Sequence, residues 1–151
     1  MNRPAHRILL VDDEPLATKA IKLQLERKGR FVVRDENDSS LALKAALEFK
    51  PELILLDVDM PGMDGADVAR QIKKSKALEG VQVVFLTSLI TRNEALLENC
   101  TDHFHVIAKP VPMAILLSIL DWLLRSGAGA ADTLPPSLVA FLRARTTATH
   151  S

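Results

Sequence analysis

The sequence predicts an α/β protein: a doubly wound parallel sheet of five strands alternating with helices, plus a short C-terminal tail segment. Aliphatic or β-branched runs alternate with stretches of helical periodicity five times along the chain, which is the pattern of a parallel sheet with helices on both faces. A continuous aliphatic run at residues 53–56 leads into a Pro-Gly turn and is typical of a strand buried on both faces. These two observations place residues 53–56 at the centre of the sheet.

Three of the expected strands lie in the N-terminal half, at residues 8–11, 31–33 and 53–56. Pro15 suits the first turn of the helix after the first strand, and Gly29 suits its C-terminal cap. The second helix follows Ser39 and Ser40, whose hydroxyls can cap it, and Pro51 closes it. Each of these strands is therefore separated from the next by one helix.

The C-terminal half contains two further strands, at residues 81–86 and 104–108, and helices at residues 65–77, 93–100 and 112–125. Residues 1–126 are expected to form the whole α/β domain. The composition then becomes rich in glycine and alanine, which is typical of a flexible linker. Residues 127–151 are expected to be this linker and a tail with one short amphipathic helix at residues 138–142.

Composition and charge limit the possible environments. The 151 residues contain 19 basic and 19 acidic side chains, so nothing in the overall charge favours nucleic acid or an anionic membrane. The single cysteine, Cys100, excludes an internal disulfide and fits a reducing compartment. No apolar run approaches the ~18 residues of a membrane span. We therefore expect a cytoplasmic protein with no membrane association and no direct binding of nucleic acid.

Functional side chains follow four of the expected strands. They are Asp12 and Asp13 after the first, Asp57 after the third, Thr87 after the fourth and Lys109 after the fifth. The carboxyl ends of parallel strands meet at one edge of the sheet, so these groups should share a pocket. Three carboxylates repel one another unless a cation joins them, and hard oxygen ligands suit Mg²⁺. The set is suited to phosphoryl transfer onto a carboxylate.

Four motifs in this order resemble the receiver domains of two-component response regulators, over residues from about 7 to 125. They are Val11-Asp12-Asp13-Glu14-Pro15, Asp57-Val58-Asp59-Met60-Pro61-Gly62-Met63-Asp64-Gly65, Leu86-Thr87-Ser88 and Lys109-Pro110. Each motif alone is weak, but four in order at predicted strand ends form a specific signal. The resemblance implies a flavodoxin-like (βα)5 fold and a signalling function controlled by phosphorylation.

The resemblance also implies roles for the acidic residues. Asp57 is expected to accept a phosphoryl group from a histidine kinase or a phosphotransfer protein. Asp12 and Asp13 are expected to bind Mg²⁺ together with Asp57 and the backbone carbonyl of Asp59. The domain is expected to catalyse its own phosphorylation and dephosphorylation while acting as a signalling module rather than a metabolic enzyme.

Phosphorylation is expected, by the same resemblance, to change the surface formed by the fourth helix, fifth strand and fifth helix. Thr87 is the expected switch hydroxyl, and Lys109 is the expected ion-pair partner of the phosphoryl group, with a cis bond to Pro110. The family places a switch aromatic three residues before the lysine, where this chain has Val106. The last helix is more apolar than one core-facing stripe requires, and a homodimer through the region of Trp122 is expected.

Two other functions fit parts of the pattern. A pseudo-receiver would bind partners without being phosphorylated, and Val106 at the switch position is compatible with it. A haloacid dehalogenase-like phosphatase also begins catalysis at a strand-end Asp-x-Asp, as in Asp57 to Asp59. That family places its further metal carboxylates after the nucleophile, whereas the acidic pair of this chain precedes it.

Overall fold

The computed structural model describes residues 5–57, 65–87, 104–126 and 142–145. The strands are β1 His6–Val11, β2 Phe31–Glu36, β3 Leu53–Asp57, β4 Gln82–Thr87, β5 Phe104–Ala108 and β6 Leu142–Arg145. The α-helices are α1 Pro15–Glu26, α2 Ala42–Phe49, α3 Gly65–Lys74 and α5 Met113–Ser126, and short 3₁₀ turns cover Ser39–Leu41 and Lys76–Leu78. No helix in these ranges is both long and apolar enough to cross a membrane.

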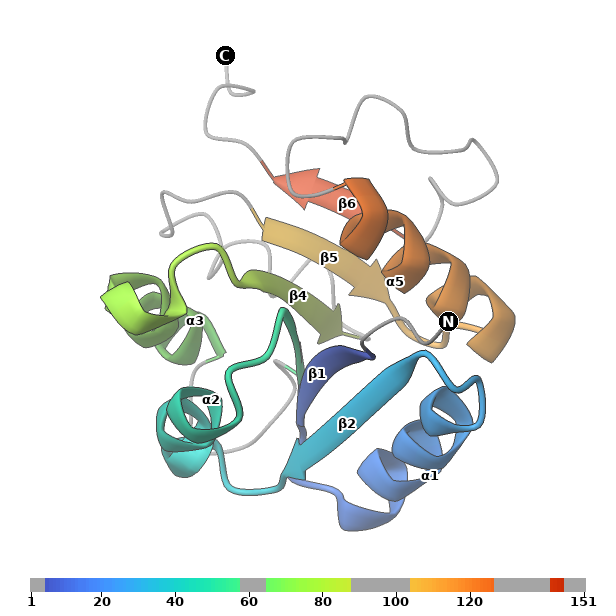
Figure 1. The fold of residues 1–151 in the computed structure, drawn as a ribbon, viewed down its shortest axis with the longest axis horizontal. Coiled ribbons are helices and arrows are strands. Elements are labelled where there is room, and N and C mark those ends of the chain that lie inside the picture. The colour runs from blue at the N-terminus through green and yellow to red at the C-terminus, as the bar shows by residue number, and fades with distance from the viewer. Residues whose placement is uncertain (1–4, 58–64, 88–103, 127–141, 146–151) are drawn as a thin grey trace.

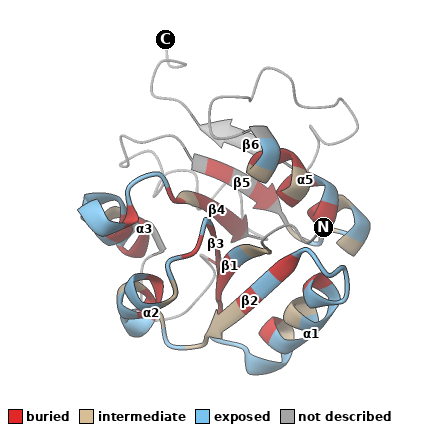
Figure 2. Cartoon of the chain, in the orientation of Figure 1, coloured by how far each residue is buried: buried red, intermediate tan, exposed pale blue. Residues whose placement is uncertain are grey.

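The described strands form one sheet in the order β2-β1-β3-β4-β5-β6 (Figure 1). The five predicted strands are all parallel, as expected. Helices α1 and α5 cover one face, and α2 and α3 cover the other (Figures 1 and 2). Each pair of helices closes one apolar cluster over the sheet, so β1 and β3 are buried from both sides. The α/β doubly wound prediction is confirmed.

Two helix boundaries differ from the expectation: α3 ends at Lys74, where the sequence predicts a helix to residue 77, and an aspartate caps the turn before α2. Pro15 occupies the first turn of α1, and Gly29 beyond its end has φ +74°, in the left-handed region. The turn before α2 is capped by Asp38, whose Oδ1 accepts the backbone N–H of Ser40 at 3.0 Å. The predicted serine cap is therefore replaced by the aspartate one residue earlier.

Strand β2 is longer than its apolar run. The sequence predicts residues 31–33, whereas the strand continues to Glu36 and pairs with β1 along its whole length, from His6 opposite Phe31 to Val11 opposite Glu36. The added residues are charged and only partly buried, as is common on an edge strand. Pairing with β1 thus extends β2 beyond the part that hydrophobicity identifies.

The C-terminal tail differs from the prediction. The expected helix over residues 138–142 would include Leu142, but Leu142 is the first residue of β6, which pairs antiparallel with β5. The sequence Leu-Arg-Ala-Arg alternates with the period of a strand, and the outer edge of β5 provides the backbone partners that a short strand needs. Residues 138–141 and the helix expected at residues 93–100 lie outside the described residues.

Candidate functional site

Three carboxylates meet at the point where the order of strands across the sheet reverses, between β1 and β3. Asp12 and Asp13 follow β1, Asp57 ends β3, and the order β2-β1-β3 sends the loops after these two strands to opposite sides. One carboxylate oxygen of each residue lies within 4.8 Å of the others. Asp12 is 7% exposed and Asp57 4%, while Asp13 is exposed. The convergence predicted from the strand ends is confirmed for these three residues.

Lys109 brings a positive charge to the same site. It follows β5 directly, and its Nζ lies 3.2 Å from Oδ1 of Asp57. The Lys109–Pro110 peptide bond is cis, as the resemblance predicted. The ammonium therefore lies against the carboxylate that ends the buried central strand.

Thr87, Asp59 and Val106 are described less fully. Thr87 is the last residue of β4, and its backbone is paired in register with Ala108, the residue before Lys109. This places the Thr87 backbone at the same edge of the sheet as Asp57, and its side chain lies outside the described part of the structure. Val106 lies in β5 opposite Phe85, and Asp59 falls outside the described residues.

The electrostatics of the cluster are most evident at Asp12. The pKa of Asp12 is raised from 3.8 to about 6, chiefly because burial disfavours the charged carboxylate. The neighbouring Asp57 contributes to this rise, whereas the backbone N–H of Glu14, 3.1 Å from Oδ1 of Asp12, and the Lys109 ammonium oppose it. The fold thus holds Asp12 where an ionised carboxylate is costly.

A divalent cation would remove that cost. The cluster offers only hard carboxylate oxygens, two from buried residues and one from an exposed residue that leaves the site open to solvent. This donor set fits Mg²⁺, which prefers oxygen ligands and retains some of its water. Asp12, Asp13 and Asp57 are the described residues that could hold it.

Asn37 supports the site although the sequence analysis did not select it. Its Nδ2 donates to the backbone oxygen of Asp12 at 2.8 Å and to Oγ1 of Thr18 at 3.0 Å. Thr18 is fully buried in α1, and its hydroxyl lies 3.0 Å from the backbone oxygen of Pro15. Asn37 directly follows β2, so extending the strand-end criterion to that strand would have identified it.

Replacing Asn37 with alanine is expected to weaken divalent-cation binding by about tenfold, because groups that orient metal ligands typically contribute this much to affinity. The amide ties Asp12 to α1 through Thr18, and alanine removes both hydrogen bonds. Calorimetric titration with Mg²⁺ measures the effect. Gln24→Ala, which removes an exposed amide from α1, is the matched control and should bind as the wild type does. Equal affinity in both variants would show that the loop holds Asp12 without the amide.

A comparison with known protein families identifies the domain that contains this site. Residues 8–121 match the model of the response regulator receiver domain, which is most of the chain. The chain belongs to this family. The match covers all three clustered aspartates and Lys109, so the residues that the structure brings together lie inside the receiver.

Individual relatives agree with this assignment. The receiver is 28% identical over 115 residues to protein PilH of Pseudomonas aeruginosa, covering 76% of this chain and 94% of PilH. It is 40% identical over 88 residues to the DNA-binding response regulator MtrA of Mycolicibacterium smegmatis, covering 58% of this chain. The matched region spans only 37% of MtrA.

A solved structure resembles the receiver both in fold and in sequence. The receiver domain of a sensor histidine kinase from Pseudomonas aeruginosa, described with a magnesium ion coordinated in its active-site cleft, superposes with a TM-score of 0.69 at 27% identity. The alignment covers 81% of this chain and 99% of that domain. The protein is therefore a phosphorylation-activated receiver of two-component signalling, a class of domain that interacts with histidine kinases or phosphotransfer proteins.

Proposed function

We propose that Asp57 is the phosphoacceptor of this receiver. One carboxylate oxygen of Asp57 attacks the phosphorus of a phosphohistidine on the partner. An O–P bond forms, the P–N bond breaks, and its electron pair leaves with the imidazole nitrogen. The observation that carries the proposal is the position of Asp57, which ends the fully buried strand β3 between the Asp12 and Asp13 carboxylates and the Lys109 ammonium.

The other residues of the site are proposed to manage charge. Asp12 and Asp13, with Asp57 and the backbone carbonyl of Asp59, hold Mg²⁺, which when bound supplies positive charge beside the phosphoryl oxygens. Lys109 neutralises a further phosphoryl oxygen, and the Thr87 hydroxyl donates to another. Lys109 can act without large movement, because its Nζ is already 3.2 Å from the attacking carboxylate.

These groups all come from one chain, which supports self-catalysis. The partner then needs to provide only the phosphoryl group, so a small donor such as acetyl phosphate should suffice. In dephosphorylation, assisted by the same charges, a water oxygen attacks the phosphorus of the acyl phosphate, the O–P bond to Asp57 breaks, and inorganic phosphate leaves with the carboxylate restored. We propose that the receiver catalyses both its own phosphorylation and its own dephosphorylation.

We further propose that residues 1–126 form the receiver and residues 127–151 an appended linker and tail, and that cytoplasmic histidine kinases or phosphotransfer proteins are the donors. The single cysteine is consistent with a reducing compartment.

A homodimer through α5 remains a proposal. Trp122 is 6% exposed because it packs in the cluster between α5 and the sheet. A partner on that face would therefore meet other residues first.

Intact-mass measurement with Mg²⁺ and acetyl phosphate tests the phosphoacceptor. The wild type should gain one phosphoryl group, and the gain should disappear on removal of Mg²⁺ and in Asp57→Asn. Asp121→Asn, which changes an aspartate on α5 that pairs with Arg30, is the matched control and should gain the group normally. Persistent labelling of Asp57→Asn would place the acceptor elsewhere.

The same experiment separates the pseudo-receiver alternative. A wild-type chain that gains no phosphoryl group, and that does not respond to beryllofluoride with Mg²⁺, would be a binding module that works without phosphorylation. The cluster of three carboxylates with Lys109 favours a receiver that is phosphorylated over a pseudo-receiver.

A further inference from the structure

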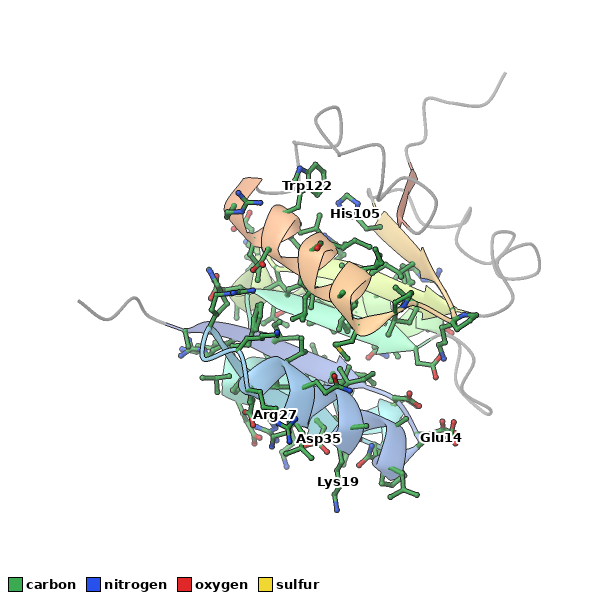
Figure 3. All side chains as sticks on the ribbon, turned by 90° about the vertical axis from the view of Figure 1, so that its right-hand side faces the viewer. Glu14, Lys19, Arg27, Asp35, His105 and Trp122 are labelled. Carbon is green, nitrogen blue, oxygen red and sulfur yellow. The ribbon has the colours of Figure 1, made fainter. Side chains whose placement is uncertain are left out.

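The outer edge of β5 is covered by the chain's own C-terminal strand. Figures 1 and 3 place β6 beyond β5 at the end of the sheet, on the side of the molecule where Figure 3 labels His105 and Trp122. Four residue pairs join the two strands: Ile107 with Leu142, Val106 with Arg143, His105 with Ala144, and Phe104 with Arg145. Without β6, the edge of β5 would present unpaired backbone groups that accept another strand.

The register of the β5–β6 ladder shows which sequence the edge of β5 prefers as its partner. Residues directly opposite each other in antiparallel strands share one face of the sheet. The register therefore sets Leu142 opposite Ile107 and Ala144 opposite His105, two residues of β5 that are buried. It sets Arg143 opposite Val106 and Arg145 opposite Phe104. Moving the register by one residue would exchange the apolar and basic positions of β6. The sequence of β6 therefore favours the observed register over a register shifted by one residue.

The connection to the rest of the chain permits two arrangements. Helix α5 spans about 21 Å at 1.5 Å per residue, and β6 runs antiparallel to β5, so Leu142 lies near the Lys109 end of the sheet. Residues 127–141 can extend to about 50 Å, which is ample for β6 to pair with its own β5. The same length allows β6 to reach the β5 edge of a neighbouring molecule.

We propose that the β5 edge is an interaction surface for a second copy of this chain, which binds by reciprocal exchange of the Leu142–Arg145 strand. The second copy is the partner that fits because its strand has the sequence and register already paired with this edge. A two-fold exchange preserves every β5–β6 pair. The monomer predominates in dilute solution, because a tethered strand competes at an effective concentration of order mM, and four residue pairs open at low cost.

A dimer formed by strand exchange would associate at the edge of β5 and not through the outer face of α5. Ile107, the last residue of β5 in the ladder, is two residues from Lys109, so the exchanged strands lie beside the phosphorylation site. Any influence of phosphorylation on the exchange rests on the proposed function of Asp57. The exchange itself depends only on the β5–β6 ladder.

Mixing two single-cysteine chains tests the exchange. In a Cys100→Ser background, one chain has Val106→Cys on β5 and the other has Arg143→Cys on β6. Directly paired residues have Cα atoms ~4.5–5.5 Å apart, within reach of a disulfide. We expect a disulfide-linked heterodimer whose yield rises with protein concentration and is at least fivefold above that of Val106→Cys mixed with Arg145→Cys. Placing Val106→Cys and Arg143→Cys in one chain should instead give an internally cross-linked monomer.

A shortened connection provides a second measurement. Deleting residues 130–139 leaves five connecting residues, too few for β6 to return along α5 to its own β5, so the shortened chain should elute as a dimer on size exclusion. Adding Arg143→Pro or Ala144→Pro to the deletion tests the ladder, because one of any two adjacent strand residues directs its N–H at the partner. One of these prolines should restore the monomer and the other should have little effect.

Two results would overturn the proposal. One is an internal cross-link that forms readily while the mixed chains give no in-register heterodimer at any concentration. The other is a deletion variant that remains monomeric. Asp57→Asn in the mixed chains should leave the cross-linking yield unchanged, so failure of the proposed phosphoacceptor and failure of the exchange give different results.

Discussion

Replacing Lys109 with glutamine is expected to lower the free energy of unfolding by about 2 kcal/mol in metal-free solution. The Lys109 ammonium lies 3.2 Å from Oδ1 of Asp57, in a cluster of three carboxylates, and glutamine keeps much of the side chain without its charge. Removing one partner of a fully buried pair costs ~3–5 kcal/mol. The cost is smaller here because the Lys109 side chain is 31% exposed and partly screened by water. Urea denaturation measures the difference.

Mg²⁺ should reduce the effect of this substitution, because a bound cation supplies positive charge beside the same carboxylates. The loss in Lys109→Gln is therefore expected to be smaller at saturating Mg²⁺ than in its absence. Lys22→Gln is a matched control, since Lys22 pairs with the partly exposed Asp35 at 3.8 Å and its loss should change stability by less than about 0.5 kcal/mol. An equal loss for Lys109→Gln with and without Mg²⁺ would contradict a role in balancing the cluster's charge.

Replacing Asp12 with asparagine is expected to stabilise the metal-free protein by about 1 kcal/mol while greatly weakening its response to Mg²⁺. Asp12 is 7% exposed and close to Asp57, so its ionised carboxylate is disfavoured in the fold. Asparagine has a similar shape and can still accept the backbone N–H of Glu14. The midpoint of thermal unfolding should rise by about 3 °C.

The response to Mg²⁺ makes this prediction specific. A cation at 100 times its dissociation constant adds about 2.7 kcal/mol to the stability of a protein that binds it only when folded. The wild type should show such a gain and Asp12→Asn much less, with a matching loss of phosphoryl uptake. Asp121→Asn on α5 should keep the wild-type response. A metal-free Asp12→Asn protein that is less stable than the wild type would show that the carboxylate gains more from its contacts than it loses by burial.

Several elements of the site were predictable because they depend on local sequence. The aliphatic run before Asp57 makes a strand buried on both faces, and a buried parallel strand directs its last residue to the carboxyl edge of the sheet. The same reasoning placed Asp12, Asp13 and Lys109, and the structure brings them within a few ångströms of Asp57. The structure confirms these positions, whereas the predicted roles of these residues, like those of Thr87 and Asp59, stay predictions.

Other elements were not predictable because distant segments create them. Asn37 resembles any polar residue near a turn until β2 pairs with β1 and places its amide 2.8 Å from the backbone oxygen of Asp12. The charged residues that lengthen β2 have no strand signal of their own. Leu142 to Arg145 combine apolar and basic residues in a run too short to indicate a strand without the β5 edge.

The sequence by itself determined the order of the described strands and helices along the chain, the parallel sheet and the acidic and basic residues at its carboxyl edge, because hydrophobic periodicity and strand-end residues act over a few neighbouring positions. Only the tertiary structure decided the support of Asp12 by Asn37, the full length of β2 and the closure of the β5 edge by β6. These three features depend on backbone and amide hydrogen bonds between segments far apart in the chain. Such bonds can form with many side-chain sequences, so they leave little trace in any one of them.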